Sequence, residues 1–311
     1  MKKVFLYAGQ GSQKVGMGKD LYESVESFRN FLDCVSLPYD FKNLMMEGPL
    51  ETLSQTEYTQ GCMAAFAAGI TKLLAEHDIV PEAACGLSLG EYGALFAAGV
   101  LRAEDYISIV AERGRVMAEA AKGCKCCMSA VLGAKSETVE QACRDYTGDA
   151  FVTVANYNCP GQYVLCGDEE AVAAVEESLK AQGVKRCVRL NVSGPFHTKY
   201  MKPAGDRLQE LFGEIEFGKP QIPVALNVTG ALYQDGDDLK DLLVRQVQQS
   251  VRLENDLRAL LAAGYTDFLE IGPGNTVSGF LKKTAKDMGI EVTVDCIETL
   301  ADFKRIIGEE A

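Results

Sequence analysis

A serine stands at the centre of a Gly-x-Ser-x-Gly pattern, in Gly86-Leu87-Ser88-Leu89-Gly90. The short apolar run at 83–85 before it is typical of a strand, and the small-residue run at 93–100 is typical of a helix. A turn this tight from strand to helix requires Gly on both sides of the serine and leaves the hydroxyl exposed at the helix N-terminus. Backbone N–H groups and the helix dipole stabilise an oxyanion at that point. The pattern predicts a nucleophile elbow that carries Ser88.

A serine hydroxyl needs a base within hydrogen-bond reach before it becomes a useful nucleophile. The chain has two histidines. His77 falls at the expected end of a helix, whereas His197 follows Gly194-Pro195-Phe196 in a loop that leaves a predicted strand. We therefore expect His197 to be the base, the alternative being an ordinary structural histidine.

An acidic third member would normally lie between the serine and the histidine in the chain. The candidates in this interval fall on predicted helix ends and turns, and none is a convincing partner: Asp145, Asp149 and Asp168. We expect a neutral carbonyl to orient His197 instead. A less basic histidine suits transfer between thioesters better than hydrolysis of amides.

A second oxyanion donor is expected from the turn Gly9-Gln10-Gly11, which follows the apolar run at 4–8. An elbow supplies one N–H from the residue after the nucleophile, here Leu89, and another loop at the same sheet edge supplies the second. A dinucleotide fingerprint would need Gly where Lys14 stands, so that function is excluded. The alternative for Gln10 is a plain tight turn.

Arg113 lies in a largely apolar helical stretch, 103–121. An arginine in this position is ordinarily at the surface or in a salt bridge. The functional alternative is a bidentate clamp on a substrate carboxylate, for which the planar guanidinium is suited.

Two segments of alternating strands and helices must position these residues. The first and last thirds of the chain alternate as in one α/β body with a parallel sheet, its helices including 60–77, 202–212, 239–248 and 253–263 and its strands including 224–228, 268–271 and 292–296. Between them lies a unit in the order β-α-β-β-α-β, which is the ferredoxin-like split βαβ motif. Its expected elements are 128–132, 137–146, 151–155, 163–166, 169–182 and 184–192. We place this insertion at 125–197 and the catalytic body at 1–124 and 198–311.

The composition excludes several classes of protein. A net charge of −13 and a pI near 4.8 argue against binding to nucleic acid or to an anionic membrane. No apolar run is long enough for a membrane span or a signal peptide, so we expect a cytoplasmic protein. Eleven cysteines without a secretory context indicate reduced thiols, and Cys124, Cys126 and Cys127 lack the second pair that a metal site needs.

Six motifs stand in the order seen in malonyl-CoA:acyl carrier protein transacylases, and from about residue 3 to residue 300 the sequence resembles that family. They are Gly9-Gln10-Gly11-Ser12-Gln13, Gly86-x-Ser88-Leu89-Gly90-Glu91-Tyr92, Arg113-Gly114, Asn156-x-Asn158-x-Pro160-Gly161-Gln162, Gly194-Pro195-Phe196-His197 and Gly272-Pro273-Gly274. The resemblance implies a large α/β-hydrolase-like body with an inserted ferredoxin-like subdomain. It also implies ping-pong transfer of malonyl from coenzyme A to the phosphopantetheine thiol of acyl carrier protein, in fatty acid biosynthesis, without a cofactor or a metal.

The resemblance also assigns roles to single residues. Ser88 would carry the acyl group and His197 would be the base. Arg113 would bind the malonyl carboxylate, and the backbone of Gln10 and Leu89 would form the oxyanion hole. Two further positions match the family's pattern: Gln246, whose carbonyl orients the histidine, and Asn156, near the active site.

The sequence departs from the family's pattern in two places. Leu87 stands where many members have His, and Gln249-Ser250 stands where many have Asn-Pro. The second departure bears on how His197 is oriented. Phe196, before His197, resembles the pattern of relatives that are selective for malonyl. We expect the protein to be a monomer. The alternatives to its expected function are a malonyltransferase serving a polyketide synthase, a serine esterase and a non-catalytic module that binds a carrier protein.

Overall fold

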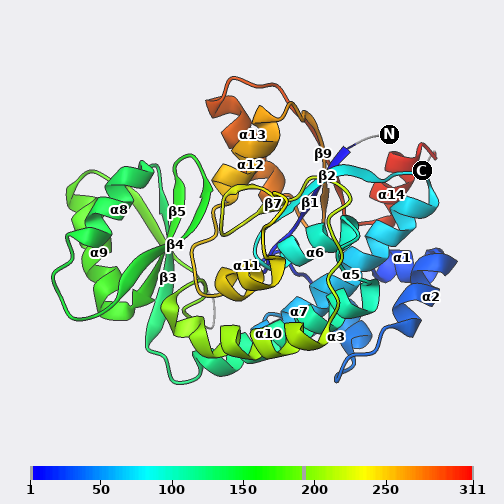
Figure 1. The fold of residues 1–311 in the computed structure, drawn as a ribbon, viewed down its shortest axis with the longest axis horizontal. Helices are drawn as coiled ribbons and strands as arrows, with labels where there is room; N and C mark the ends of the chain where they lie inside the picture. Colours follow the sequence, from blue (N-terminus) through cyan, green and yellow to red (C-terminus); the bar gives the residue numbers. More distant parts are fainter. Residues whose placement is uncertain (1–2, 191–193, 310–311) are drawn as a thin grey trace.

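The computed structural model describes residues 3–190 and 194–309 (Figure 1). A parallel sheet of four strands, in the order β10-β9-β1-β2, forms the centre of the larger body. Its strands are β1 (Lys3–Tyr7), β2 (Pro81–Gly86), β9 (Asp267–Ile271) and β10 (Thr293–Ile297). Strands from the two ends of the chain pair side by side, so the prediction that the first and last thirds form one α/β body is confirmed.

The side chains of β1 alternate between two hydrophobic cores. Phe5 and Tyr7 enter the core on one face of the sheet, and Val4 and Leu6 enter the core on the other. Both faces are buried, which explains why this strand is apolar after Lys3. The first core also contains residues of α5 (Thr56–Glu76), α6 (Leu89–Ala97), α7 (Ala103–Ala121) and α10 (Lys202–Glu214), and the second contains residues of α12 (Leu253–Ala262) and α13 (Thr276–Asp287).

A separate antiparallel sheet, at the left of Figure 1, has the strand order β4-β5-β3-β6 and its own hydrophobic core. Its elements are β3 (Cys126–Leu132), α8 (Ser136–Arg144), β4 (Val152–Cys159), β5 (Gln162–Asp168), α9 (Glu169–Ala181) and β6 (Arg186–Arg189). This is the predicted β-α-β-β-α-β unit. The predicted end of its last strand, at Val192, lies outside the described residues, and the boundaries at 124/125 and 197/198 stay predictions.

Strand β4 joins this sheet to the larger body. The N–H of Tyr157 donates to the carbonyl of Val251 at 2.8 Å, and the N–H of Val251 donates to the carbonyl of Ala155 at 2.9 Å. The hydroxyl of Ser250 donates to the carbonyl of Val154 at 2.6 Å. The two sheets are therefore held together by backbone pairing beside α12, and not by side chains alone.

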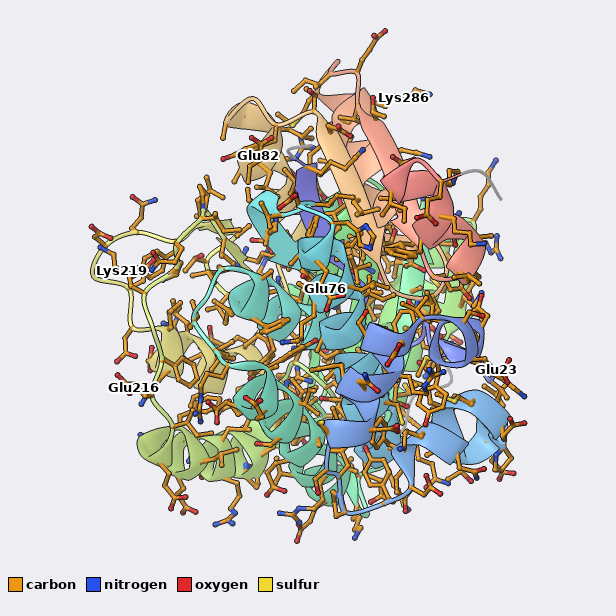
Figure 2. The ribbon with its side chains drawn as sticks, turned by 90° about the vertical axis from the view of Figure 1, so that its right-hand side faces the viewer. Glu23, Glu76, Glu82, Glu216, Lys219 and Lys286 are labelled. Carbon is orange, nitrogen blue, oxygen red and sulfur yellow. The ribbon has the colours of Figure 1, made fainter. Side chains whose placement is uncertain are left out.

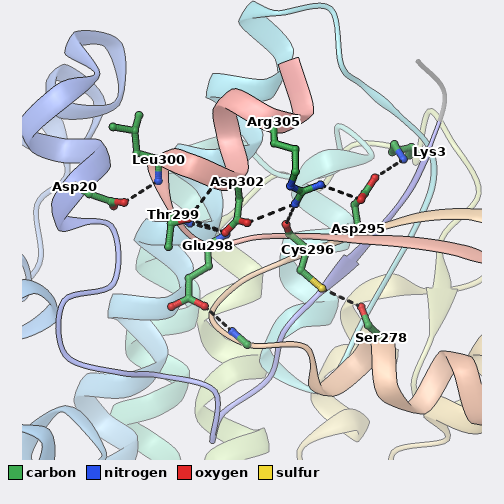
Figure 3. Close-up of polar contacts among 11 residues, drawn as sticks. Lys3, Asp20, Ser278, Asp295, Cys296, Glu298, Thr299, Leu300, Asp302 and Arg305 are labelled. Atoms are coloured by element: carbon green, nitrogen blue, oxygen red, sulfur yellow. Dashed lines mark hydrogen bonds and ion pairs between the residues drawn. The ribbon is translucent and has the colours of Figure 1, made fainter. Parts of the chain in front are cut away.

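The last helix, α14 (Leu300–Ile307), is capped at its N-terminus and bonded to the sheet from its last turn (Figure 3). Thr299 and Asp302 form a capping box, in which each side chain accepts a backbone N–H of the other. Arg305 bonds the Asp295 side chain and the Cys296 carbonyl of β10. These contacts fix the C-terminal helix against the edge strand.

Several predicted boundaries are wrong. The helix after the elbow begins at Leu89 and not at 93, because α6 starts directly after Ser88. The segment 224–228 forms only β7 (Ala225–Leu226), which pairs with β8 (Ala231–Leu232), while Val224 bridges to β2 at Ala84. The segment with a mixed pattern before residue 59 contains four short helices: α1 (Lys19–Ser24), α2 (Glu26–Cys34), α3 (Phe41–Glu47) and α4 (Leu50–Leu53). The remaining elements of the larger body are the 3-10 helix η1 (Lys199–Met201) and α11 (Leu239–Gln246).

Charged side chains line the face of the larger body that Figure 2 shows, among them Glu23, Glu76 and Glu82.

All eleven cysteines are free thiols, in agreement with the prediction. Within residues 3–190 and 194–309, no helix is both long enough and apolar enough to cross a membrane.

Candidate active site

The elbow around Ser88 is as tight as its two glycines suggest. Strand β2 ends at Gly86 and α6 begins at Leu89, so only Leu87 and Ser88 connect them. The φ of Ser88 is 55°. A Cβ atom on Gly86 would lie 2.0 Å from the backbone carbon of Gly90, and one on Gly90 would lie 2.3 Å from the carbonyl oxygen of Tyr7. No side chain fits at either glycine, and Ser88 is held in a backbone conformation that non-glycine residues rarely adopt.

Ser88, His197 and Gln246 form a chain of two hydrogen bonds. The Nδ1 atom of His197 lies 2.7 Å from the backbone carbonyl oxygen of Gln246, which can only accept, so Nδ1 carries the proton. The Nε2 atom is then free to accept from the Ser88 hydroxyl at 2.8 Å. The histidine is therefore oriented by a neutral carbonyl, in the tautomer that a base requires.

The pKa of His197 lies far below its ordinary value. Burial is the largest cause, and together with the positive charge of Arg113 it lowers this pKa to about 3 against the opposing hydrogen bond with the Gln246 carbonyl. His197 is consequently neutral, and able to accept a proton, throughout the neutral pH range.

Arg113 projects from α7 to the nucleophile. It is 1% exposed, and its Nη2 atom donates to Ser88 Oγ and to the side-chain oxygen of Gln246, both at 2.9 Å. Its Nη1 atom donates to the side-chain oxygen of Gln60 at 2.6 Å. All three partners are neutral, and no Asp or Glu in the two described ranges forms an ion pair with this guanidinium. Its buried charge is thus available to an anion that reaches Ser88.

Asn227 and Gln60 belong to the site but carried no sequence signal. The Oδ1 atom of Asn227 accepts from the Ser88 N–H at 2.8 Å, and its Nδ2 atom donates to the Gly86 carbonyl at 2.9 Å. One buried amide therefore braces the elbow on both sides of Leu87. Each residue stands alone in its segment, without a spacing that marks it.

A cleft of about 220 Å³ opens between the two sheets at Ser88. The larger body contributes residues of the elbow, of the loop after β1 and of the helices, and the smaller sheet contributes residues of β3, β4 and β5; the lining includes Gln10, Ser88, His197, Phe196, Met128, Asn156, Asn158 and Val164. The structure thus brings Gln10 and Asn156 into the same cleft as the nucleophile. The loop of Gln10 reaches the elbow closely, since a Cβ atom on Gly9 would lie 2.8 Å from the carbonyl oxygen of Leu87.

The two departures from the family pattern have visible consequences. Leu87 packs against the second hydrophobic core and lines the cleft. Ser250 bonds to β4, and the Gln246 carbonyl still lies 2.7 Å from His197 Nδ1, so the histidine keeps its partner.

The histidine and the aspartate that the sequence analysis did not favour as site residues lie outside the active site. His77 is an exposed helix-end residue that packs edge-on against Phe303, and Asp168 bonds Tyr200 and the Phe151 N–H. In the part of the chain that the structure describes, no cluster of three His, Cys, Asp or Glu side chains is arranged to hold a metal ion.

Comparison with known proteins places this geometry in a family. The acyl transferase domain family matches residues 4–302. The malonyl CoA-acyl carrier protein transacylase of Bacillus subtilis is 38% identical over 285 residues, which cover 91% of this chain and 90% of that protein. The crystal structure of MCAT from Streptococcus pneumoniae superposes with a TM-score of 0.91 at 38% identity, covering 98% of this chain and 99% of that one.

A further solved structure describes a malonyl-transacylase in complex with a type II PKS acyl-carrier protein, named PlMCAT:AntF. It matches with a TM-score of 0.92 and 33% identity, and covers 99% of both chains. The likeness extends over the whole of the described fold, both sheets included. The chain therefore belongs to the malonyl CoA-acyl carrier protein transacylase family of acyl transferases.

Proposed function

We propose that this chain moves a malonyl group from malonyl-CoA to the phosphopantetheine thiol of acyl carrier protein, through an ester on Ser88, in fatty acid biosynthesis. The observation that carries the proposal is the buried guanidinium of Arg113, whose hydrogen-bond partners in the described chain are neutral and whose Nη2 atom lies 2.9 Å from the nucleophilic oxygen. A serine esterase has no use for such a charge, whereas an acyl group that ends in a carboxylate pairs with it.

Acylation of Ser88 needs one proton transfer in each direction. His197 Nε2 takes the hydroxyl proton as Ser88 Oγ bonds to the thioester carbon, and the imidazolium returns that proton to the departing thiolate as the C–S bond breaks. The second half-reaction runs the same steps in reverse with the phosphopantetheine thiol as nucleophile. A weakly basic His197 is sufficient, because a thiolate needs less help from an acid than an amine does when it leaves.

The oxyanion of each tetrahedral intermediate needs two donors. Leu89 is the first residue of α6, and helix-initial N–H groups have no intrahelical acceptor. Gln10 supplies the second N–H from the loop that packs on the elbow. Asn156 lies across the cleft, where it would contact the acyl group or the thioester arm.

Arg113 changes partners during the reaction in this proposal. In the free enzyme its Nη2 atom donates to the Ser88 hydroxyl. Once Ser88 is an ester its oxygen is a poor acceptor, and the malonyl carboxylate offers two better ones in the fork geometry that guanidinium prefers. The clamp thereby favours the acylated state.

The test is to incubate the protein with isotopically labelled malonyl-CoA and to locate the label by peptide mass spectrometry. We expect one malonyl group on the peptide that contains Ser88 and none in Ser88→Ala. Absence of an adduct, or equal labelling by acetyl-CoA, would contradict malonyl transfer, and release of free malonate without transfer to the carrier would favour the esterase.

Replacing Arg113 by Ala should remove the preference for malonyl while some acetyl transfer remains, because only the carboxylate loses its partner. We expect kcat/KM for malonyl-CoA to fall on the order of 10²-fold or more, the scale of a lost charged hydrogen bond. The measurement is steady-state kinetics with both thioesters. Unchanged selectivity would remove Arg113 as the clamp.

We further propose that the protein acts as a monomer in the cytoplasm, without a cofactor, on a carrier protein of fatty acid synthesis. A polyketide carrier is the alternative, since PlMCAT is seen with one. Transfer rates to purified carriers of each kind distinguish them, and light scattering tests the monomer.

A further inference from the structure

Glu91 is a buried carboxylate in the first turn of α6, three residues after the nucleophile, and the steps described so far do not use it. It is 1% exposed. Its Oε2 atom accepts from the side-chain Nε2 of Gln246 at 2.7 Å and from the backbone N–H of Asn227 at 3.3 Å. Burying a carboxylate is costly, so a chain that keeps one here gains something from its position.

Gln246 connects Glu91 to the two other charged or titrating groups of the site. Its Nε2 atom also donates to the Ser88 carbonyl at 2.8 Å, and its Oε1 atom accepts from Arg113 at 2.9 Å. Its backbone carbonyl accepts from His197 Nδ1 at 2.7 Å. Because a carboxylate accepts and a guanidinium donates, Glu91 and Arg113 together fix which way the Gln246 amide points.

The titratable groups around Glu91 come from several elements of the chain, and those that are charged differ in the sign of their charge. Arg113 on α7 lowers the pKa of Glu91, and Asp256 on α12 lies within reach of the charge of Glu91. Among the described residues, Cys85 on β2 and Tyr92 on α6 are also within reach of that charge, and burial raises the pKa of both. Burial, together with the charge of Glu91, raises the pKa of Asp256 well above its usual range.

Glu91 therefore carries the negative charge of this cluster. Burial raises its pKa to about 7, against the bonds from Gln246 and Asn227 and the charge of Arg113. Its carboxylate gains the proton near neutral pH, in a range where His197 stays neutral.

We propose that Glu91 is a positioning residue for the acyl transfer: it fixes the Gln246 amide so that this single residue aligns both His197 and Arg113 with Ser88. The proposal rests on the malonyl transfer proposed above. The ionised form is the stronger acceptor for Gln246 Nε2, so the alignment is firmest above the pKa of Glu91 and weakens as pH falls through it.

Two substitutions separate the charge from the contact. Glu91→Gln keeps the size and an acceptor oxygen but removes the charge, and Glu91→Ala removes both. Glu270→Gln is the matched control, because Glu270 is also a fully buried carboxylate that accepts two backbone N–H groups, from Val277 and Ser278. It lies on β9, and its described hydrogen bonds do not include Gln246.

The experiment measures the rate of Ser88 acylation by malonyl-CoA between about pH 5 and 9 in the wild type and all three variants. We expect the wild-type rate to fall as pH drops through about 7 and Glu91→Gln to lose that inflection. Glu91→Ala should lose on the order of 10²-fold in acylation rate at every pH, the cost of misplaced catalytic groups. Glu270→Gln should keep the wild-type profile.

The outcomes separate this inference from the proposed function. A wild type that is never acylated removes malonyl transfer itself. Normal acylation of the wild type, together with a wild-type profile in both Glu91 variants, overturns the positioning role and leaves malonyl transfer standing. If Glu91→Ala does not fold, Glu91→Gln decides alone, and an unchanged inflection in it overturns the proposal.

Discussion

Arg113 acts on both partners of the reacting pair. Its Nη2 atom donates to Ser88 Oγ, and its charge lowers the pKa of His197. The first contact favours a developing alkoxide, whereas the second weakens the base that must create it. A substrate carboxylate that pairs with Arg113 cancels this charge, so binding of malonyl would restore basicity to His197 at the moment it is needed.

Removing the guanidinium should therefore raise the pKa of His197. We expect this pKa to rise above about 3 in Arg113→Ala yet to remain below 6.5, because burial is the larger cause and persists. A pH titration of the His197 imidazole proton resonances in the wild type and in Arg113→Ala measures the change. An unchanged His197 titration would contradict the electrostatic account.

The elbow depends on an element that is not next to it in the chain. Asn227 follows the two-residue strand β7 and holds Ser88 N–H and the Gly86 carbonyl through its buried side chain. The strained φ of Ser88 is thus supported by the segment that runs beside β2, and not by α6 alone.

Replacing Asn227 by Ala should weaken both the fold and the chemistry. It leaves at least two buried backbone groups without partners, at about 1 to 3 kcal/mol each. We expect a loss of at least about 2 kcal/mol in the free energy of unfolding by urea, and slower acylation of Ser88. Asn255→Ala, which removes an exposed asparagine nearby, should change neither. Wild-type stability in Asn227→Ala would show that the elbow supports itself.

The elements that sequence patterns predicted well are those with a strong period or a demanding turn. The buried strand β1, the helices α5 and α7 and the order of the inserted unit follow from apolar runs and alternation. The four helices α1 to α4 are short, and their burial depends on contacts with α5 and, for α1, with α14 at the other end of the chain. Propensity alone does not fix segments of that kind.

The site was predictable where chemistry restricts the residue type. Ser88 and His197 follow from the elbow and from the scarcity of histidine, and the neutral carbonyl beside His197 follows from the missing acid. Gln246 and Asn156 came only from the family resemblance, because an amide in a helix or a strand has no distinctive spacing. Asn227 and Glu91 act through contacts between elements far apart in the chain, which no local pattern records.

At the scale of the whole molecule, the junction between the two sheets sets the width of the cleft. Backbone bonds from β4 to Val251 and the bond from Ser250 to the Val154 carbonyl hold that junction. The cleft walls come from both sides of it.

Ser250→Ala should loosen this junction without touching the nucleophile. We expect a loss of about 0.5 to 1.5 kcal/mol in the free energy of unfolding, the net value of one hydrogen bond, and a KM for malonyl-CoA that rises more than kcat falls. Urea unfolding and steady-state kinetics measure these changes. Ser178→Ala, which removes a hydroxyl bond on the exposed face of α9, is the control, and equal kinetics in the two variants would mean that the junction does not govern binding.

The reacting groups and the facing wall of the cleft come from different parts of the chain. The nucleophile and the guanidinium belong to the parallel-sheet body, and the base lies in the segment between β6 and η1. Met128, Asn156 and Val164, which line the same cleft, belong to the other sheet. Substitutions that enlarge or reshape the acyl site at these three positions leave Ser88, His197 and Arg113 unchanged, although Met128 and Val164 also pack in the first hydrophobic core. An evolving or engineered enzyme of this architecture can thus acquire a new acyl substrate by changing one wall, with its catalytic apparatus inherited whole.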